Sequence, residues 1–211
     1  MTDEPGLEHP YTFAEPIRTE RLVLRPMRPA DADAVHAYQS REDVCRYLLF
    51  EPRDRARVAE VIADHVAHDR LERTGDYLQI ATERRSDGRL LGDVYFQLRS
   101  VPNRTGEIGW TFHPDHHGQG YATEAARAVL RLAFGRLGLH RVVAELDPRN
   151  DASVALCRRL GLREEARFVR DMWFKGEWAD TGVYGILEEE FARAAGGSTA
   201  SRPEALDGTA E

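Results

Sequence analysis

Apolar and polar side chains alternate along the first half of the chain with a period that changes from segment to segment. Residues 21–25 alternate one by one, which predicts a half-buried strand. Two segments of helical spacing follow, one ending near Tyr38 and a longer one over residues 53–73 with a single apolar stripe. Residues 77–82, 90–98 and 105–112 again have the pattern of strands, separated by turn signals. We expect these three strands to form an antiparallel meander.

The second half of the chain changes to a helical period after Pro114. Residues 122–137 carry a strong apolar stripe, and Gly138 ends the predicted helix. A strand over 141–146 and a short helix over 152–160 follow. The last predicted elements are two strands, 164–172 and 181–187, on either side of an aromatic turn over 173–178.

Composition divides the chain into one domain with two flanking segments. Its 211 residues fit a single domain. Residues 1–17 hold three prolines and little periodicity, so we expect an extended N-terminal lead-in. Residues 192–211 contain one leucine among small, polar and acidic residues, too few apolar groups to offset the entropy of ordering. We therefore expect a domain over residues 18–191 and a disordered tail over 192–211.

Charge and composition argue against several classes of function. A formal net charge of −7 does not suit a nucleic-acid binder, which needs a basic face. No apolar run approaches the roughly 18 residues of a membrane helix, and the acidic N-terminus is unlike a secretory signal. Cys45 and Cys157 have neither metal-ligand spacing nor a disulfide framework. These features predict a cytoplasmic protein with no nucleic-acid or membrane partner.

The segment from His116 to Ala125, His-His-Gly-Gln-Gly-Tyr-Ala-Thr-Glu-Ala, carries the strongest chemical signal. It follows a predicted strand and opens a predicted helix. Gly118 and Gly120 lack Cβ atoms, so backbone N–H groups can approach a ligand, and the helix start adds unpaired donors. Such a turn suits a pyrophosphate, although a plain glycine turn has the same sequence. It is neither a Walker loop nor a dinucleotide fingerprint, because the Gly-Lys-Ser/Thr and the third glycine are missing.

In context this segment resembles the pyrophosphate signature of GNAT acyltransferases, with His117 in place of the usual Arg or Gln. Three further segments resemble the Rim-type branch, which acetylates ribosomal-protein N-termini: 19–26, Glu107-Ile-Gly-Trp110, and Asn150-Asp-Ala-Ser153 with Leu160-Gly161. The resemblance covers about residues 18–190. It implies an α+β, three-layer fold whose mixed, mostly antiparallel sheet is splayed between its fourth and fifth strands. It also implies an acyl-CoA N-acyltransferase and a possible homodimer.

The resemblance implies that acetyl-CoA, or another acyl-CoA, is the co-substrate. Its pantetheine arm would pair with the strand edge left open by the splay. Asn150 would bond the pantetheine amides, or simply cap its helix. Arg158 or Arg159 would reach the phosphates, with Arg158 preferred, or both would be surface charges. The expected cofactor-binding residues are Trp110, Thr111, Phe112, His117, Gly118, Gln119, Gly120, Ala122, Thr123, Asn150, Ser153 and Arg158.

Two steps of the implied reaction need proton transfer. An amine attacks only when neutral, so a base helps, and Glu107 is the candidate, directly or through a water. Glu107 could instead be a strand carboxylate paired with a cation such as Arg104, and Asp93 is the second candidate base. Cys157 occupies the late-helix position where many GNAT enzymes have a tyrosine acid. Ser153 is the nearest hydroxyl in that helix, as proton donor, cofactor contact or helix N-terminal residue.

The acceptor is expected to enter from the other side of the splay. The candidate contacts are Glu42, Asp43, Tyr47, Tyr95, Trp173 and Trp178, and the tryptophans could equally be core or dimer contacts. A protein N-terminal α-amine is the first candidate acceptor. Alternatives are a small amine such as an aminoglycoside or polyamine, a succinyl-CoA-using variant, and a non-catalytic acyl-CoA sensor. We expect no metal, since His113, His116 and His117 do not have the spacing of a zinc site.

Overall fold

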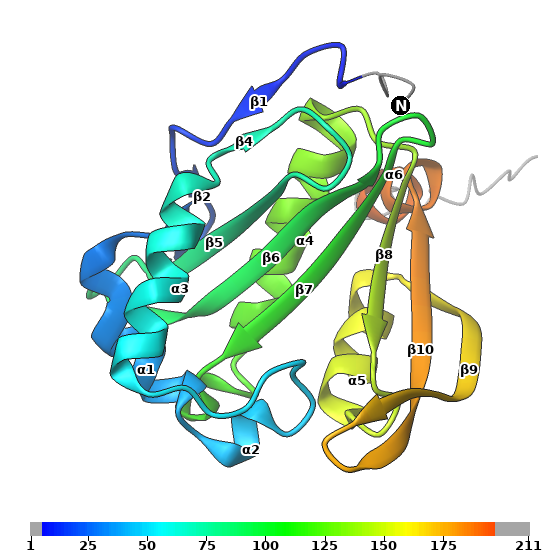
Figure 1. Ribbon diagram of the computed structural model, residues 1–211. Helices are drawn as coiled ribbons and strands as arrows, with labels where there is room; N and C mark the ends of the chain where they lie inside the picture. The colour runs from blue at the N-terminus through cyan, green and yellow to red at the C-terminus, as the bar shows by residue number, and fades with distance from the viewer. Residues whose placement is uncertain (1–5, 197–211) are drawn as a thin grey trace, which may run out of the picture.

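The computed structural model describes residues 6–196 and shows one sheet of eight strands with helices on both faces (Figure 1). A separate two-stranded ribbon pairs β1 (Tyr11–Thr12) with β4 (Arg70–Leu71). In spatial order the large sheet consists of β2 (Ile17–Arg18), β3 (Leu22–Pro26), β5 (Tyr77–Arg84), β6 (Leu90–Ser100), β7 (Thr105–Phe112), β8 (Arg141–Leu146), β10 (Glu177–Leu187) and β9 (Arg163–Phe174).

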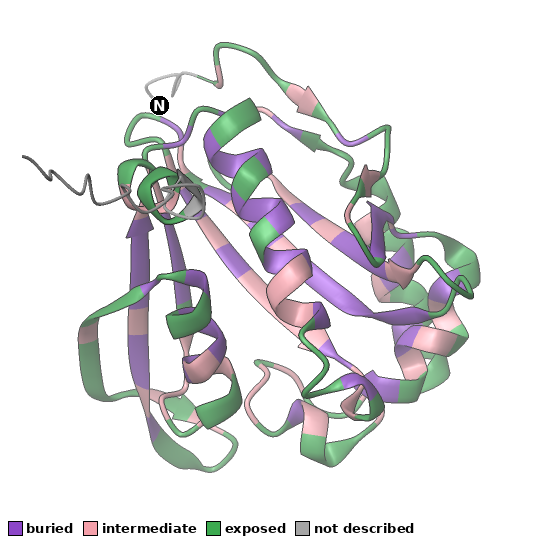
Figure 2. Cartoon of the chain, turned by 180° about the vertical axis from the view of Figure 1, so that it is seen from behind, coloured by how far each residue is buried: buried purple, intermediate pink, exposed green. Residues whose placement is uncertain are grey.

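Helices cover the two faces of this sheet, which gives the three-layer α+β fold expected from the sequence (Figures 1 and 2). The helices are α1 (Ala32–Gln39), α2 (Glu42–Cys45), α3 (Arg55–Ala67), α4 (Tyr121–Arg131), α5 (Asp151–Leu160) and α6 (Glu188–Gly196). α4 and α5 lie on one face and α1 and α3 on the other. No helix among residues 6–196 is long and apolar enough to cross a bilayer.

Two hydrophobic cores hold the layers together. The larger one packs the apolar stripe of α4, including Ala125, Ala126 and Val129, against β3, β5, β6 and β7. The smaller one packs Val35 of α1 and Val58 of α3 against Ala81 of β5. Each helix therefore buries the face that its 3.6-residue period predicts.

The sheet is splayed between β7 and β8, as expected. These strands are the parallel pair of the sheet, and their pairing ends at Glu107 opposite Val143. β7 continues to Phe112 and β8 to Leu146, but the two strands diverge (Figure 1). The edge of β7 beyond Glu107 therefore has no strand partner among the described residues, which leaves backbone donors and acceptors open to a ligand.

The structure corrects three boundaries predicted from the sequence. α3 ends at Ala67 rather than near residue 73, because the following residues form β4 and pair with β1. The aromatic turn over 173–178 is reduced to Lys175 and Gly176, since Trp173 and Trp178 pair with each other across β9 and β10. α6 runs to Gly196, five residues into the stretch expected to be disordered. Residues 197–211 lie outside the described residues.

The N-terminal lead-in packs onto the domain where the structure describes it. Phe13 is buried in the larger core, and its backbone N–H donates to the carbonyl of Asp69 at 2.7 Å. The predicted boundary at residue 18 therefore falls inside a packed segment, and residues 1–5 lie outside the described ones. α4 is also extended, because a π-helical turn over Leu132–Arg136 follows it before Gly138. A bond from the N–H of Leu137 to the carbonyl of Leu132 closes this turn.

Candidate active site

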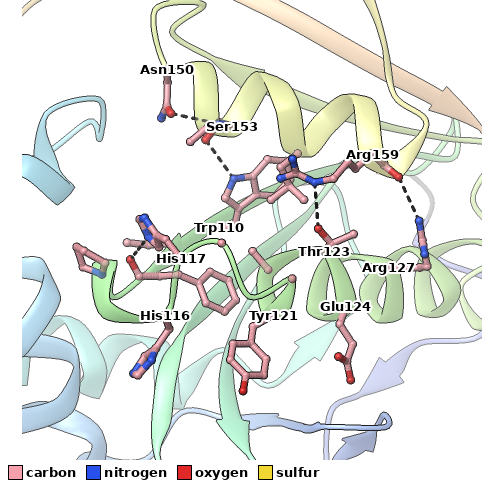
Figure 3. Close-up of a pocket in the computed structure, with 18 of the residues that line it drawn as sticks. Trp110, His116, His117, Tyr121, Thr123, Glu124, Arg127, Asn150, Ser153 and Arg159 are labelled. Atoms are coloured by element: carbon pink, nitrogen blue, oxygen red, sulfur yellow. Dashed lines mark hydrogen bonds between the residues drawn. The ribbon is translucent and has the colours of Figure 1, made fainter.

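A cavity of about 1050 Å³ lies along the open end of β7. Its walls come from β7, the loop that follows, the start of α4, one face of α5, and α2 with its loop. Ten of the expected cofactor residues line it: Trp110, Thr111, Phe112, His117, Gly118, Gly120, Ala122, Thr123, Asn150 and Ser153. Figure 3 shows many of these side chains gathered between α4 and α5. The splay thus brings together segments that are far apart in the sequence.

The glycine turn has the backbone conformation that an anion cradle needs. Gly118 and Gly120 have φ of +71° and +79°, a region that residues with a Cβ rarely adopt. Gly120 is the N-cap residue of α4, so the unpaired N–H groups of the first helical turn begin at this point. The helix dipole adds partial positive charge there, which suits a diphosphate.

A cluster of polar contacts fixes this turn to the start of β3. The guanidinium of Arg21 donates to the carbonyl of Gln119 at 2.9 Å and to the carboxylate of Glu124 at 2.7 Å. Thr19 also donates to Glu124, at 2.6 Å. Arg21 further covers the ring of Tyr121, with its guanidinium carbon 4.6 Å from the ring centre. Arg21 could not be predicted as a site residue from local patterns, because its partner Glu124 lies 103 residues away in the sequence.

Two residues of the signature stabilise the turn rather than face a ligand with their side chains. The ring of His117 bonds through Nε2 to the carbonyl of Phe112 at 2.9 Å. The side-chain amide of Gln119 donates to the carbonyl of Asp115 at 3.1 Å, and Gln119 does not line the cavity. His117, which stands where the family usually has Arg or Gln, therefore stabilises the turn through its side chain. Gln119 contributes to the site through its backbone.

A hydrogen bond crosses the cavity between β7 and α5. The indole N–H of Trp110 donates to Oγ of Ser153 at 3.2 Å (Figure 3). Because the indole occupies the acceptor side of this hydroxyl, Ser153 keeps its own O–H free to donate. Asn150 caps α5, and its Oδ1 accepts the N–H of Ser153 at 3.2 Å. The capping role is thus present, and Asn150 also lines the cavity.

The cationic wall of the cavity differs from the expected one. Among the described residues Arg159, and not Arg158, lines it, which favours Arg159 over the predicted Arg158. Arg159 lies two helical turns after Ala152, another lining residue, and so on the same face of α5. Arg158 is rotated around the helix by about 100° from Arg159. Arg159 reaches Oγ1 of Thr123 at 3.4 Å, and its carbonyl accepts from Arg127 at 3.1 Å. The described cations of this wall are Arg21, Arg127, Arg131 and Arg159.

Glu107 lies at the point where the two strands separate, but on the opposite face of β7 from Trp110. Its ion-pair partner is Arg99 at 3.3 Å rather than Arg104, and Arg99 also pairs with Glu145. Burial and the nearby Glu145 raise the pKa of Glu107, and Arg99 opposes them. Glu107 is absent from the walls of the cavity among the described residues. A proton transfer from the cavity would therefore have to reach it through a water or a bound substrate.

Asp93, the second candidate base, is shielded by α1. Its side chain is 2% exposed and accepts hydrogen bonds from the hydroxyl of Tyr38 and the amide of Gln79. Burial raises the pKa of Asp93 to about 6, against the effect of these two donors. The carboxylate joins α1 to the sheet and does not line the cavity.

The side chain of Cys157 belongs to the core of the domain. The thiol is fully buried in the larger core, and burial raises its pKa to about 12. A thiol of this kind is a poor nucleophile near neutral pH. Ser153, one turn earlier, faces the cavity instead (Figure 3).

A second cavity, of about 610 Å³, lies between α2 and the β9–β10 hairpin. Asp43 and Tyr47 line both cavities, so the two spaces share a wall. Glu42 lines the second cavity, together with Glu51, Glu177, Arg46, Arg149 and Lys175. Tyr95 and Trp173 lie outside both cavities among the described residues. Tyr95 packs on Tyr77, and Trp173, which is 62% exposed, packs on Trp178.

The three histidines near the turn make separate contacts. His113 accepts the N–H of Asp115 at 3.2 Å, and His117 braces the carbonyl of Phe112. The Nε2 atom of His116 is buried without a hydrogen-bond partner among residues 6–196. In the same range, no three His, Cys, Asp or Glu side chains are grouped to hold a metal.

Comparison with known proteins agrees with this geometry. The family model described as an acetyltransferase (GNAT) domain matches residues 21–163. The uncharacterized N-acetyltransferase YnaD of Bacillus subtilis is 33% identical over 178 residues, covering 83% of this chain and 98% of that protein. A GNAT-family acetyltransferase of Bacillus anthracis has a crystal structure with a TM-score of 0.75 and 30% identity, covering 82% of this chain and 99% of that chain.

Two more distant relatives carry names that mention a substrate. YdaF of Bacillus subtilis, whose name provisionally describes a ribosomal N-acetyltransferase, is 26% identical over 82% of this chain and 94% of that protein. The spermidine N(1)-acetyltransferase of Escherichia coli is 24% identical over 81% of this chain and 88% of that protein. The family model and YnaD extend over most of the described domain, so the chain belongs to the GNAT acetyltransferase family and is an acyl-CoA-dependent N-acetyltransferase.

Proposed function

We propose that this enzyme transfers an acetyl group from acetyl-CoA to a primary amine while both substrates are bound. The observation that carries the proposal is that the two cavities adjoin, with Asp43 and Tyr47 in the walls of both. The larger cavity has the glycine cradle and the arginines, which suit the coenzyme. The smaller one opens on the side of α2 and the hairpin, which suits an acceptor that arrives from outside.

The residues of the larger cavity fit coenzyme A in order along its length. The backbone from Gly118 to Thr123 would hold the diphosphate, with Arg21 fixing the turn. Arg127 and Arg159 supply positive charge for the remaining phosphate. The open edge of β7 would pair with the pantetheine amides as an added strand does. Acetyl-CoA supplies the activated acyl group, and the chain orients it.

Glu107 is the proposed base for the amine. An amine must lose a proton to attack, and an α-amine does so more readily than a lysine amine, with a pKa of roughly 7.7–8.0 against 10.4. A carboxylate whose pKa is raised by burial and by Glu145 is a better proton acceptor than an ordinary one. Because the side chain lies on the face opposite Trp110, the proton would pass through a water.

Ser153 is the proposed donor to the departing sulfur. Its hydroxyl lines the cavity and accepts from Trp110, so its own hydrogen is free for the thiolate. This contact would stabilise negative charge that appears on the sulfur as the thioester bond breaks. It replaces the tyrosine that many enzymes of this family have where this chain has Cys157.

The first candidate acceptor is the α-amine of a polypeptide. Exposed apolar side chains belong to the two segments that line the second cavity: Leu49 of the α2 loop is 78% exposed, and Trp173 and Trp178 form a pair on the hairpin. Apolar surface of this kind suits the side chains of a polypeptide better than a fully charged small molecule. The resemblance to YdaF supports the same acceptor class.

A polyamine is the second candidate, because carboxylates line the second cavity. Glu42, Asp43, Glu51 and Glu177 supply negative charge for a cationic chain, although three of them already have cationic partners: Arg41 at 2.8 Å from Asp43, Lys175 at 3.5 Å from Glu51 and Arg149 at 2.6 Å from Glu177. The relative named spermidine N(1)-acetyltransferase supports this alternative.

The decisive experiment measures thiol release from acetyl-CoA with matched acceptors. One peptide has a free α-amine, its partner is the same peptide with the α-amine blocked and a lysine added, and spermidine is the third acceptor. We expect turnover with the free α-amine alone, confirmed by mass spectrometry of the product. Turnover with spermidine only would replace the first acceptor with the second. Binding without turnover on any amine would favour the sensor hypothesis, and a parallel assay with succinyl-CoA identifies the acyl group.

Glu107→Gln in the same assay tests the base. Removing a positioned base lowers kcat by on the order of 10²–10⁴-fold. We expect this loss with no change in acetyl-CoA affinity by calorimetry. Glu145→Gln is the matched control, since it removes a neighbouring carboxylate and leaves Glu107 in place.

Three further features stay predictions. They are a cytoplasmic location, a homodimer, and a functional domain that is complete over residues 18–191. Light scattering of the purified chain tests the second, and activity of the fragment 18–191 tests the third. Phe13 is buried in the core, so loss of stability in that fragment would move the boundary towards the N-terminus.

A further inference from the structure

The chain has one lysine, and that lysine joins two parts of the molecule that the splay separates. Lys175 lies in the two-residue turn between β9 and β10. Its ammonium group donates to the carbonyl of Cys45, the last residue of α2, at 2.6 Å. It also donates to the carbonyl of Phe50 at 3.0 Å and lies 3.5 Å from the carboxylate of Glu51. All three partners belong to α2 and the loop that follows it.

The backbone at this turn shows that the lysine is held at a conformational cost. Lys175 has φ of +49° and Gly176 has φ of +83°. Two-residue hairpin turns with positive φ at both positions favour Asn, Asp or Gly at the first. A lysine there is disfavoured by its Cβ, and the contacts of its ammonium group offset that cost.

Lys175 and Glu51 line the second cavity, and their contact lies far from the strand pairing that joins the two arms. One arm contains β3, β5, β6 and β7, and the other contains β8, β9, β10 and α5. The arms are paired between β7 and β8 only as far as Glu107 and Val143. At the opposite end the α2 loop and the hairpin turn approach each other (Figure 1). Lys175 bridges them there and lines the second cavity, with a side chain that is 23% exposed.

We propose that Lys175 is a positioning residue, a clasp that holds the β9–β10 turn against the α2 loop and so fixes the width of the acceptor entrance. The proposal rests on the proposed function in one respect, namely that the acceptor enters through the second cavity. Glu51 neutralises the ammonium charge on the α2 side. The other charged residues that line the same cavity are Glu42, Asp43, Arg46, Arg149 and Glu177. The clasp acts through the position of the turn, and no bond is made to the reacting atoms.

A kinetic comparison separates the clasp from the charge it carries. Lys175→Met removes the ammonium group and both hydrogen bonds, while Arg46→Met removes one positive charge from the same cavity and no link between the arms. We expect Lys175→Met to raise the KM for the acceptor about tenfold, the scale of one charge-assisted hydrogen bond, with little change in the KM for acetyl-CoA. Arg46→Met reports the effect of losing one positive charge from this cavity, and the clasp predicts a larger rise in acceptor KM for Lys175→Met than for Arg46→Met. Lys175→Arg keeps a donor group and should restore part of the loss.

A chemical measurement tests the clasp without any activity. Arg170→Lys adds an amine on the same hairpin, at an exposed position, as an internal reference. A brief pulse of acetic anhydride followed by mass spectrometry compares the two amines in one sample. We expect Lys175 to react about tenfold more slowly than the reference, because its ammonium group must first leave two carbonyls.

The outcomes of these experiments distinguish the clasp at Lys175 from the proposed acetyltransferase function. Equal reaction rates of the two amines, or equal changes in acceptor KM in Lys175→Met and Arg46→Met, would overturn the clasp and leave the acetyltransferase proposal standing. Slow labelling of Lys175 in an enzyme that acetylates no tested amine would overturn the proposed acceptor and leave the clasp intact.

Discussion

At the scale of single residues, Glu107 shows how neighbours tune one carboxyl group. Burial and Glu145 raise its pKa above the ordinary 4.5, and Arg99 lowers it. Arg99 also bonds Glu145, so the two carboxylates share one cation. The proton affinity of the proposed base therefore depends on two side chains that need not touch a substrate.

This arrangement predicts that substitutions of Glu145 and Arg99 shift the acidic limb of the kcat/KM pH profile in opposite directions. Glu107 must be ionised to accept a proton, so kcat/KM for the acceptor rises with pH through its pKa. Glu145→Gln removes a raising influence, so the limb should move to lower pH. Arg99→Met removes a lowering influence, so the limb should move to higher pH. Kinetics over the acidic range check both shifts, and a limb that stays in place in both variants would assign it to another group.

At the scale of elements, the start of α4 depends on a backbone conformation more than on side chains. A Cβ added at Gly118 would meet no atom within 4 Å, so a substitution there tests φ alone. Gly135, in the π-helical turn, also has open space and no positive φ. The two glycines form a matched pair that differs in backbone strain.

Gly118→Ala should weaken acetyl-CoA binding, while Gly135→Ala should not. The alanine at 118 disfavours the left-handed conformation by roughly 1 kcal/mol or more, which reorients the N–H groups of the cradle. We expect the Kd for acetyl-CoA to rise on the order of tenfold. Calorimetry measures both variants, and equal affinity in the two would show that the turn does not hold the diphosphate.

The attachment of α1 to the sheet has a pH dependence of its own. The carboxyl group of Asp93 has a folded pKa of about 6, above its ordinary 3.8, because it is buried. Between these values the folded chain binds the proton and the unfolded chain does not. The stability contributed by Asp93 is therefore complete below 3.8 and is lost as pH rises through about 6.

Asp93→Asn should remove the loss of folding stability that Asp93 causes as pH rises. The difference in unfolding free energy between variant and native chain should change in favour of the variant by on the order of 2–3 kcal/mol as pH rises through this window. A weaker hydrogen bond from asparagine would change the difference in unfolding free energy by the same amount at every pH. The readout is therefore how that difference changes with pH. Denaturant titrations at several pH values measure it, and parallel stability curves would contradict the buried carboxylate.

At the scale of the whole molecule, the ligand cavity lies between two arms that are joined by the larger core, by the β7–β8 pairing and by the contacts of Lys175. α4 and β7 form one wall and α5 the other, with the bond from Trp110 to Ser153 between them. A ligand that contacts both walls binds the folded state alone and stabilises it in proportion to its affinity. Ligand binding and global stability are therefore coupled in this fold.

Acetyl-CoA should raise the melting temperature more than other nucleotides do. At about one hundred times its Kd, a ligand stabilises the fold by about 2.7 kcal/mol, which corresponds to about 5–10 °C for a domain of this size. ATP and NAD, which lack the pantetheine arm, should give smaller shifts. Thermal unfolding with each ligand measures this, and equal shifts would favour a general nucleotide site over a coenzyme A site.

The sequence by itself determined most of the long elements and the chemistry of the turn. The stripe of α4, the strands of the meander, and Gly118 and Gly120 at the start of a helix all depend on neighbours within a few residues. Local spacing and the steric freedom of glycine are properties of the chain before it folds, so they can be predicted from it. The family resemblance came from these same local segments.

The tertiary structure alone decided which side chains meet. Thr19 contacts Glu124 across 105 positions, and Lys175 contacts Cys45 across 130. Arg159 rather than Arg158 lines the cavity because the docking of α5 selects one of its faces. Such contacts depend on how the strands pair and where β7 leaves β8, and no local period encodes them. The acid–base environment of Glu107 and the clasp at Lys175 follow from long-range packing, which only the folded chain contains.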